Sequence, residues 1–487
     1  MTSPKPGQSA DPLRNFLAID ERGPLIAWAQ RPIGQCLIYA IALGVALTLL
    51  PWWQAVLIAT AAMAMACRPQ ARQSILFTST WLGAFLEIGR AEGPTATDIG
   101  LILAHEHIST LPATGLALAL LLGVMLGAWA LLAYVRRHPG SFLARRPLLS
   151  LLALELLLCT LPALDALQGL PRVLLWSMLI VLTPYIWFLP YAVVDQRSRT
   201  PTDLSQQIGV LRPFWSPTYL PFGKGTSFLH KTLAKNPQEL AVTQLKAVKL
   251  LLWTQVLRAL KNGTDWLFLD TLQVPTTGDA IQAFLNGQPV PIAMAWAALT
   301  ISTARYSLQV AMWAGLFVGM ARLAGYRLPR GSWRPLESRT LMEYFNRFHF
   351  YFKELLVDNF FVPTFFSVFR KHPRLRMFFA TFMAAGVGNA CWHFLYDIQV
   401  LTSLGPAQAL QSFSSYAFYC LVLAIGIGLS QVRASRGIRP SATPFGRVCS
   451  FLFVWSFVVG LHVFGDESRD HSLADRFFFF LSLFGAM

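Results

Sequence analysis

Long apolar runs alternate with short polar loops along most of this 487-residue chain. A helix needs roughly 20 apolar residues to cross the hydrocarbon core of a bilayer. Runs that approach this length lie near residues 34–50, 52–66, 75–89, 110–134, 147–167, 173–194, 290–304, 306–325, 377–395, 413–431 and 448–464. The pattern predicts an all-α polytopic membrane protein with about ten to eleven transmembrane helices, joined by re-entrant or interfacial helices.

The composition agrees with this fold class. Hydrophobic residues make up 54% of the chain and charged residues only 13%, whereas soluble domains carry about 25% charged residues. The net charge of +16 is explained by basic cytoplasmic loops and anionic lipid headgroups. We therefore expect the lipid bilayer, and no nucleic acid, as a partner.

The charges in the loops predict the orientation. Basic loops follow the second, fourth and sixth apolar runs, as at Arg68 and Arg136, while the loops between them are acidic or neutral, as at Glu92 and Asp470. Lys and Arg gather in cytoplasmic loops. We therefore expect a multi-pass protein of the plasma (inner) membrane with a cytoplasmic N-terminus.

Four sections follow from the pattern. Residues 1–33 form a cytoplasmic N-terminal segment, residues 34–195 form N-terminal transmembrane helices, and residues 290–487 carry the candidate chemistry. Residues 196–289 differ because their apolar stretch contains Lys246, Lys249, Arg258 and Lys261. Such a stretch is typical of an interfacial or re-entrant helix.

Two polar motifs lack the spacing that a ligand site needs. The turn at 223–225, Gly-Lys-Gly, does not have the glycine and hydroxyl positions of a phosphate-binding loop, so we expect a flexible turn. His105, Glu106 and His107 are adjacent ligands without a distant third, which is a weak metal signal. The six cysteines show no ligand spacing, and no metal is expected.

The strongest candidate chemistry lies between residues 319 and 397. His349 stands among aromatic residues with Glu354 and Asp358 close behind it. An ionisable group inside a membrane protein is costly and is a candidate functional residue. Two interpretations of His349 stay open, a structural ion pair and an orienting network.

His393 follows an apolar run that contains small residues. Small residues allow helices, or a substrate chain, to approach closely. The predicted orientation places His393 toward the outer end of its helix. A neutral imidazole there can take a proton from a hydroxyl, because its ordinary pKa lies near physiological pH. The alternative is a histidine bound to neighbouring carbonyl groups.

These motifs resemble the membrane-bound O-acyltransferase family, in particular the bacterial branch that acetylates alginate or D-alanylates teichoic acid. Gly319–Tyr326 resembles the family's Gly-x-Ala-Arg-x-x-Gly-Phe segment, and Tyr344–His349 its aromatic block ending in Arg-x-His. Asp358 and Pro363 fall at the family's distances from that histidine. Asn389–Phe394 resembles the second motif, Gly-Leu-Trp-His-Gly. The resemblance covers about 80 residues, within a family-like core at 290–487.

The resemblance implies roles for individual residues. His393 is the expected catalytic base, and His349 and Asp358 are the expected motif residues near the acyl donor. Trp392, Arg347 and Asn346 are expected to support them. The site of the donor itself stays open, with basic cytoplasmic candidates at Arg322, Arg339 and Lys353.

The expected activity is transfer of an acyl group from a cytoplasmic thioester, acyl-CoA or another, to a hydroxyl group outside the cytoplasm. The thioester is a co-substrate, and no permanently bound cofactor is expected. The acceptor is a polysaccharide by first preference, then a glycolipid or lipid, then a protein. A periplasmic or carrier-protein partner is compatible with this activity.

Three positions depart from the family's pattern, and two other function classes stay open. Val357 stands where the family has Arg, Phe394 where it has Gly, and Gly315 where its bacterial branch often has an acidic residue. The alternatives are a multi-pass transporter or lipid flippase, suggested by the number of apolar runs, and a family-like scaffold without catalytic activity.

Overall fold

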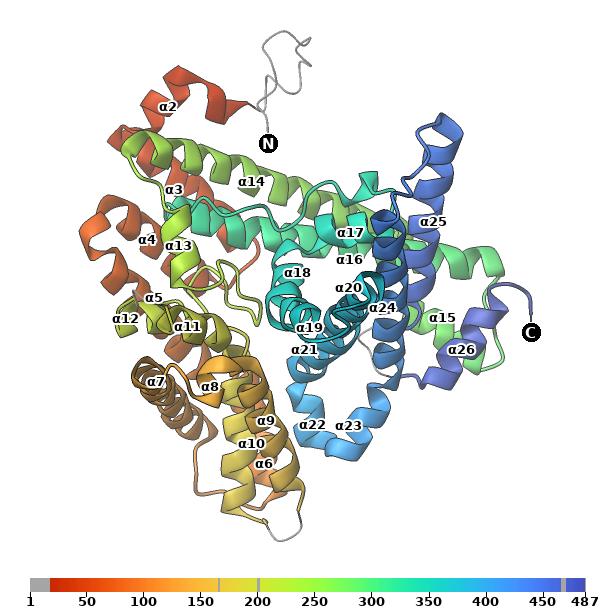
Figure 1. The fold of residues 1–487 in the computed structure, drawn as a ribbon, viewed down its shortest axis with the longest axis horizontal. Coiled ribbons are helices and arrows are strands. Elements are labelled where there is room, and N and C mark those ends of the chain that lie inside the picture. The colour runs from red at the N-terminus through yellow and green to blue at the C-terminus, as the bar shows by residue number, and fades with distance from the viewer. Residues whose placement is uncertain (1–17, 165–166, 199–201, 466–469, 487) are drawn as a thin grey trace.

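The computed structural model describes residues 18–164, 167–198, 202–465 and 470–486. Within these ranges every regular element is a helix and no strand forms. The protein is therefore all-α, in agreement with the predicted class (Figure 1). Residues 1–17 of the expected N-terminal segment lie outside the described residues.

The N-terminal half begins with helices of 7 to 17 residues and one longer helix, α7. Several of them start with a proline in the first turn, where the missing N–H costs nothing. The elements up to residue 196 are η1 (Ile19–Glu21), α2 (Gly23–Ala29), α3 (Pro32–Leu47), α4 (Trp52–Cys67), η2 (Pro69–Ala71), α5 (Arg72–Ile88), α6 (Pro94–His105), α7 (Ala113–Arg137), α8 (Phe142–Arg145), α9 (Pro147–Thr160), η3 (Leu161–Ala163), α10 (Leu170–Leu182), η4 (Thr183–Tyr185) and α11 (Leu189–Gln196).

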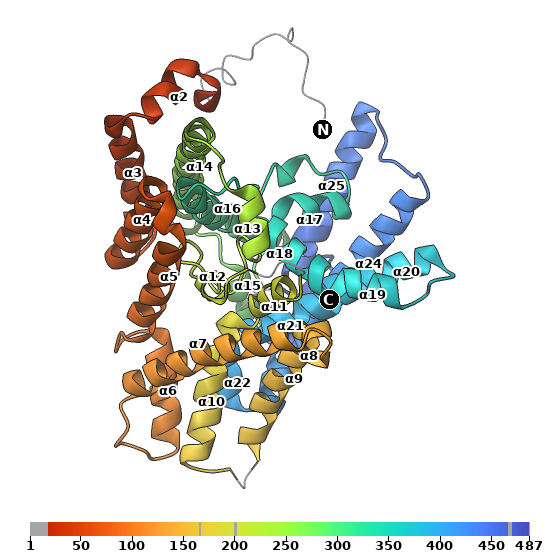
Figure 2. The same cartoon turned by 60° about the vertical axis from the view of Figure 1, so that its left-hand side comes forward.

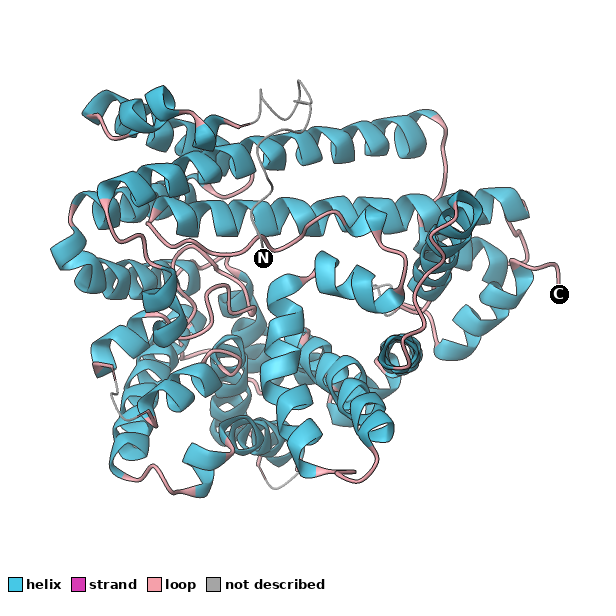
Figure 3. Cartoon of the chain, turned by 45° about the horizontal axis from the view of Figure 1, so that its top comes forward, coloured by secondary structure: helices cyan, strands magenta, loops and turns pink. Residues whose placement is uncertain are grey.

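Two long helices dominate the middle of the chain. The elements of this part are α12 (Leu204–Gly209), α13 (Thr226–Thr232), α14 (Pro237–Thr264), the π-helical η5 (Asp265–Thr271), α15 (Thr277–Leu285) and α16 (Ile292–Leu323). Figures 1 and 3 show α14 and α16 lying side by side over most of their length. Gly315 and Gly319 of α16 make this close approach possible, because a Cβ at Gly319 would come within 2.9 Å of Leu251.

The C-terminal part contains shorter, interrupted helices that end in two longer ones and a final short one. Its elements are η6 (Pro335–Glu337), α17 (Leu341–Phe348), α18 (Phe350–Leu356), the π-helical η7 (Val357–Phe361), α19 (Val362–Ser367), α20 (Pro373–Phe382), the π-helical η8 (Met383–Gly388), α21 (Asn389–Tyr396), α22 (Ile398–Leu404), α23 (Pro406–Ser412), α24 (Ser414–Ser435), α25 (Pro444–His462) and α26 (Leu473–Ser482).

The number of candidate membrane spans is lower than predicted. Five helices of the described residues are long and apolar enough to cross a membrane, or up to seven if each of two bent pairs counts as one span. The expected ten to eleven are not confirmed. One reason is that the runs near 290–304 and 306–325 form a single 32-residue helix, α16. Another is that α4 has only 16 residues, and that α2 and α3 are bent by 86° at their junction.

The basic stretch of the middle section belongs to α14, and Pro237–Thr271 is one of the five candidate spans by length and composition. Its expected interfacial or re-entrant placement stays a prediction. Carboxylates compensate two of its four basic residues, because Lys249 pairs with Asp20 and Lys261 pairs with Asp265. Pairing lowers the cost of placing a charge in an apolar environment.

Three hydrophobic cores hold the helices together, and each combines distant parts of the sequence. The first joins α7 and α10 to Leu355 and Leu395. The second joins α3 and α4 to α14, α16 and Tyr351. The third joins α15 to α24 and α26. Figure 2 shows α3 to α5 on one side of the molecule and α20, α24 and α25 on the other. Tyr191 of α11 donates to Asp358 of η7 and so links the N-terminal half to the motif-bearing part.

Candidate functional site

The structure brings His349 and His393 close to the same aromatic ring. His349 lies between α17 and α18, and His393 lies on α21. The ring of Phe352 is 6.0 Å from the imidazole of His349 and 5.8 Å from that of His393, measured between ring centroids. Trp392 lies 5.0 Å from the same ring. We call His349, Phe352, Trp392 and His393 the histidine site.

Two π-helical segments position the helices of this site. η7 lies between α18 and α19, and η8 directly precedes α21. They meet where Gly388 faces Phe360, since a Cβ at Gly388 would come within 2.7 Å of that ring. π-Helical turns are often found at functional sites. The close contact at Gly388 therefore sets the distance between the two histidine-bearing segments.

The histidine of α21 stands in an aromatic environment. The His393 ring lies 4.4 Å from Tyr416 of α24 and 4.8 Å from Trp392, between centroids. Two buried polar atoms lie nearby on the same helix, Trp392 Nε1 and Asn389 Oδ1, and neither has a hydrogen-bond partner among the described residues. Buried polar atoms usually find a partner, so these two atoms are exceptions at the histidine site.

Burial keeps His349 neutral. It lowers the pKa of this imidazole from 6.5 to about 4, because the charged form loses its hydration in the apolar surroundings. The ring packs against Phe348 at 4.7 Å between centroids. At neutral pH His349 therefore offers one N–H donor and one nitrogen acceptor.

Lys224 pairs with both carboxylates that follow His349. Its Nζ lies 2.7 Å from Asp358 Oδ2 and donates to Glu354 Oε2 at 2.8 Å. The hydroxyl of Tyr191 donates to Asp358 at 3.1 Å. Burial alone would raise the pKa of Glu354, but the hydrogen bonds from Lys224 and Lys353 outweigh it and lower that pKa. The carboxylates of Glu354 and Asp358 therefore form their ion pair with Lys224 and not with His349.

The Gly-Lys-Gly turn is thus an ordered part of the site, which sequence reasoning missed. Gly223 and Lys224 have positive φ angles of 110° and 51°. Gly225 packs against Asp195, whose Oδ2 would lie 2.7 Å from a Cβ at this position and accepts the N–H of Ser227 at 2.9 Å. The two glycines around a lysine were the available signal. Glycine accommodates the positive φ angle at residue 223 and the close approach of Asp195 at residue 225.

The remaining predicted residues make local contacts. Arg347 pairs with Glu343, and its guanidinium lies 5.6 Å from the centre of the Trp333 ring. Asn346 is exposed. Arg322 donates two hydrogen bonds, of 2.9 and 2.6 Å, to the carbonyl of Leu328.

The two other donor candidates are also engaged. The backbone N–H of Arg339 donates to Glu343 Oε2 at 2.9 Å. The Lys353 ammonium lies 2.9 Å from Glu354 and 4.9 Å from the centre of the Phe350 ring. The side chain of Lys353 thus has structural partners, whereas the contact of Arg339 is made by its backbone. The position of a thioester donor stays a prediction.

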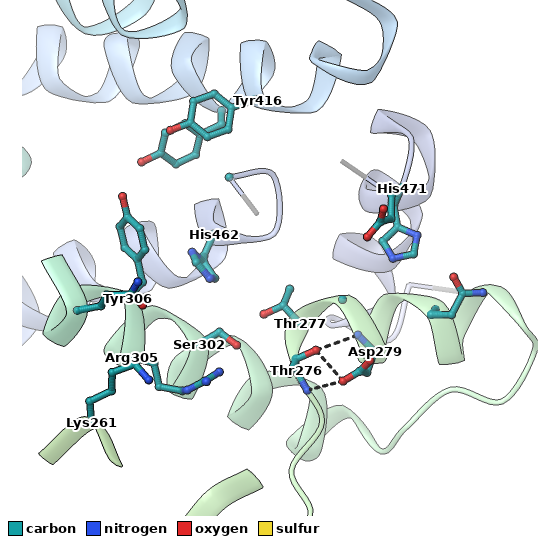
Figure 4. A pocket seen from close by; sticks show the side chains of 16 residues that line it. Lys261, Thr276, Thr277, Asp279, Ser302, Arg305, Tyr306, Tyr416, His462 and His471 are labelled. Carbon is teal, nitrogen blue, oxygen red and sulfur yellow. Dashed lines mark hydrogen bonds between the residues drawn. The ribbon is translucent and has the colours of Figure 1, made fainter. Parts of the chain in front are cut away.

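A polar pocket adjoins the histidine site. Its volume is about 600 Å³, within the roughly 300–1,000 Å³ typical of ligand sites. α14, α15, α16, α24 and α25 contribute to its wall, together with residues 465, 470 and 471 (Figure 4). Tyr416 belongs to this wall and also contacts His393. Tyr306, opposite, lies 6.4 Å from Phe348, which packs on His349.

Glu106 has a structural role instead of a metal-binding one. It accepts the N–H of Gly169 at 2.6 Å and pairs with Arg172 at 3.0 Å. Burial would raise its pKa, but these bonds outweigh burial and lower it. In the part of the chain that the structure describes, no three His, Cys, Asp or Glu residues lie close enough together to hold a metal ion.

The departure at Gly315 has a steric cause. A Cβ at this position would collide with the Thr254 hydroxyl of α14. An acidic side chain therefore has no room where α16 packs against α14, although the bacterial branch of the resembled family often has one at this position. No protein-family model matches this chain, and no curated protein matches it.

Proposed function

We propose that this membrane protein is an O-acyltransferase. It moves an acyl group from a cytoplasmic thioester, acyl-CoA in the first place, to a hydroxyl group of an extracytoplasmic acceptor, most simply a polysaccharide. The observation that carries the proposal is that the rings of His349 and His393 both lie within 6.0 Å of the Phe352 ring, between centroids, beside a polar pocket.

In this proposal His393 is the catalytic base. Its imidazole accepts the proton of the acceptor hydroxyl while the oxygen attacks the thioester carbonyl. The tetrahedral intermediate then collapses, the C–S bond breaks, and the proton passes from His393 to the departing thiolate. The products are an ester and a free thiol, so atoms and charges balance. General-base catalysis of this kind typically contributes about 10²–10⁴-fold to the rate.

His349 and the aromatic rings have supporting roles in the same step. A neutral His349 can donate its N–H to the thioester carbonyl as negative charge develops on the oxygen. Phe352 and Trp392 limit access of water, which protects the thioester from hydrolysis. The Lys224 network holds η7 in place and thereby positions Asp358.

The test is release of free thiol from acetyl-CoA by the purified protein in nanodiscs, with and without polysaccharide extracted from the cell envelope. We expect acceptor-dependent thiol release and a labelled acetyl group on the polysaccharide. His372→Ala is the matched control because His372 is an exposed loop histidine. Thiol release that does not depend on any hydroxyl acceptor would contradict the proposal.

A transporter is the second candidate, and the bent helices favour it. Helices α2 and α3 are bent by 86°, and Leu170–Tyr185 is bent by 65° relative to Leu189–Gln196. Broken helices are common at the binding sites of transporters. Transport predicts movement of an unmodified solute or lipid across the vesicle membrane without thioester consumption, so the same preparation separates the two candidates.

A further inference from the structure

Aromatic, polar and charged side chains line the polar pocket, and none of its described residues has an aliphatic side chain. An acyl chain or a lipid tail would be expected to contact aliphatic side chains in its site. Five carry hydroxyl or amide groups outside the aromatic residues: Thr276, Thr277, Gln282, Ser302 and Gln309. Hydroxyl and amide groups can both donate and accept hydrogen bonds. A ligand with the same dual capacity, such as a polyol or a sugar, matches this wall.

The charges of the pocket do not favour an anion. Lys261 and Arg305 are its two strong cations, and both pair with Asp265. Asp279 and Asp470 add two carboxylates to the wall. An anionic ligand would therefore meet two cations that already share the carboxylate of Asp265, and two further carboxylates that repel it.

Three tyrosines supply flat surfaces at the end of the pocket near the histidine site. Tyr306 comes from α16, and Tyr416 and Tyr419 come from α24, with their ring centroids 5.1 Å apart. Figure 4 shows Tyr306 and Tyr416 extending toward the same space from opposite helices. A tyrosine ring combines an apolar face with a polar edge, which suits the C–H face and the hydroxyl groups of a sugar ring.

One buried hydroxyl group points into this space. Thr277 is only 3% exposed, and its Oγ1 has no hydrogen-bond partner among the described residues. In Figure 4 this oxygen is directed toward the interior of the pocket, between His462 and Ser302. An unsatisfied buried hydroxyl costs free energy, and a ligand hydroxyl placed in the pocket would remove that cost.

We infer that the polar pocket binds an uncharged sugar unit of the acceptor and presents one of its hydroxyl groups past Tyr416 to His393. The role as acceptor site rests on the proposed acyl transfer, whereas binding of the sugar does not. The inference narrows the acceptor from polysaccharides in general to those with neutral sugar units.

The test measures binding directly, on the full-length protein in nanodiscs free of glycoside detergents. Maltotriose, mannotriose and galactotriose are the neutral probes, trigalacturonate is the anionic comparison, and decanol is the aliphatic comparison. We expect saturable binding of at least one neutral trisaccharide by isothermal titration. Absence of binding by all three, or Thr277-dependent binding of trigalacturonate or decanol, would overturn the inference.

The diagnostic variant is Thr277→Val, which removes the hydroxyl and keeps the shape. We expect it to weaken trisaccharide binding about tenfold, through loss of one buried hydrogen bond, with an unchanged or higher unfolding temperature. Thr300→Val is the matched control, because Thr300 is exposed on α16 and outside the pocket wall. Equal affinity in wild type and Thr277→Val would contradict the assignment.

Trisaccharide binding and acyl transfer, measured on the same wild-type preparation, separate this inference from the proposed function. Trisaccharide binding without any acyl transfer by the wild type would contradict the proposed function but support the sugar site. Transfer to hydroxyl acceptors without trisaccharide binding would contradict the sugar site but support the proposed function.

Discussion

The histidine site and the polar pocket are adjacent, but different kinds of side chain line them. The histidine site is built from aromatic rings, and it is held by a steric contact between two π-helical segments. The pocket next to it is polar, and hydroxyl, amide and charged groups line it. Tyr416 belongs to the pocket wall and contacts His393. In the proposed acyl transfer, the aromatic histidine site would keep the thioester away from water, and the polar pocket would hold the hydroxyl acceptor.

The strongest way to separate the two regions is removal of the proposed base. We expect His393→Ala to lower acetyl transfer by about 10²–10⁴-fold while the pocket remains intact. Free thiol release and acetyl incorporation measure the effect, with His372→Ala as control. Full activity in His393→Ala would show that the imidazole is not the base.

The steric contact between the π-helical segments η7 and η8 can be disrupted by substitution of Gly388. Gly388→Ala places a methyl group within 2.7 Å of the Phe360 ring, and overpacking of this kind costs about 1–3 kcal/mol. We expect lower stability in chemical unfolding and lower transfer activity.

Gly127→Ala is the matched control for this change, because a Cβ at Gly127 of α7 would meet no atom within 4 Å. If Gly388→Ala unfolds like the control and keeps its activity, the distance between η7 and η8 is not set at this glycine.

Loss of the Lys224 ammonium should have a moderate effect. Lys224→Met leaves Asp358 without its cation and Glu354 with Lys353 alone, and we expect a loss of about 1–3 kcal/mol. The lowered pKa of Glu354 stabilises the fold above its ordinary pKa, and this contribution is lost as pH falls through the lowered value. Urea unfolding between pH 3 and pH 7 should therefore show a flatter profile in Lys224→Met than in the exposed-site control Lys231→Met.

The burial of His349, a basic group, predicts a second pH dependence of folding stability. Its folded pKa of about 4 lies below the ordinary 6.5, so the unfolded chain binds a proton that the folded protein does not. Stability should fall as pH drops from 6.5 toward 4, and this group should add no further loss below that range. His349→Gln should reduce the slope; an unchanged slope would mean that His349 is solvated.

The smallest effect is expected at Asn346. Its side chain is exposed on α17, and exposed substitutions usually change stability by about 0.5 kcal/mol or less. We expect Asn346→Ala to have wild-type transfer and unfolding behaviour. A clear loss of transfer would place Asn346 in contact with a substrate.

The all-helical class followed from the sequence because long apolar runs leave few alternatives in a bilayer. The number of spans did not, because hydrophobicity does not show that residues 290–325 form one helix or that α2 and α3 bend at their junction. The pairing of Lys249 with Asp20 and of Lys261 with Asp265 could not be predicted either, and it lowers the cost of these two charges on α14.

The two histidines were found from their local motifs, but their surroundings were not. Lys224 lies 130 residues from Glu354 in the sequence, and no local pattern links them. The polar pocket draws on five helices between residues 237 and 462. Such sites depend on long-range packing, which spacing along the chain does not encode.

The interleaving of the three cores limits how this protein can be divided. A fragment that starts at residue 290 would carry both histidines but would expose the faces of α16 and α18 that pack on α3, α4 and α14. It would therefore fail as a transplantable module, in the laboratory as in recombination between genes. Changes to the acceptor should instead arise by substitution within the intact helical assembly.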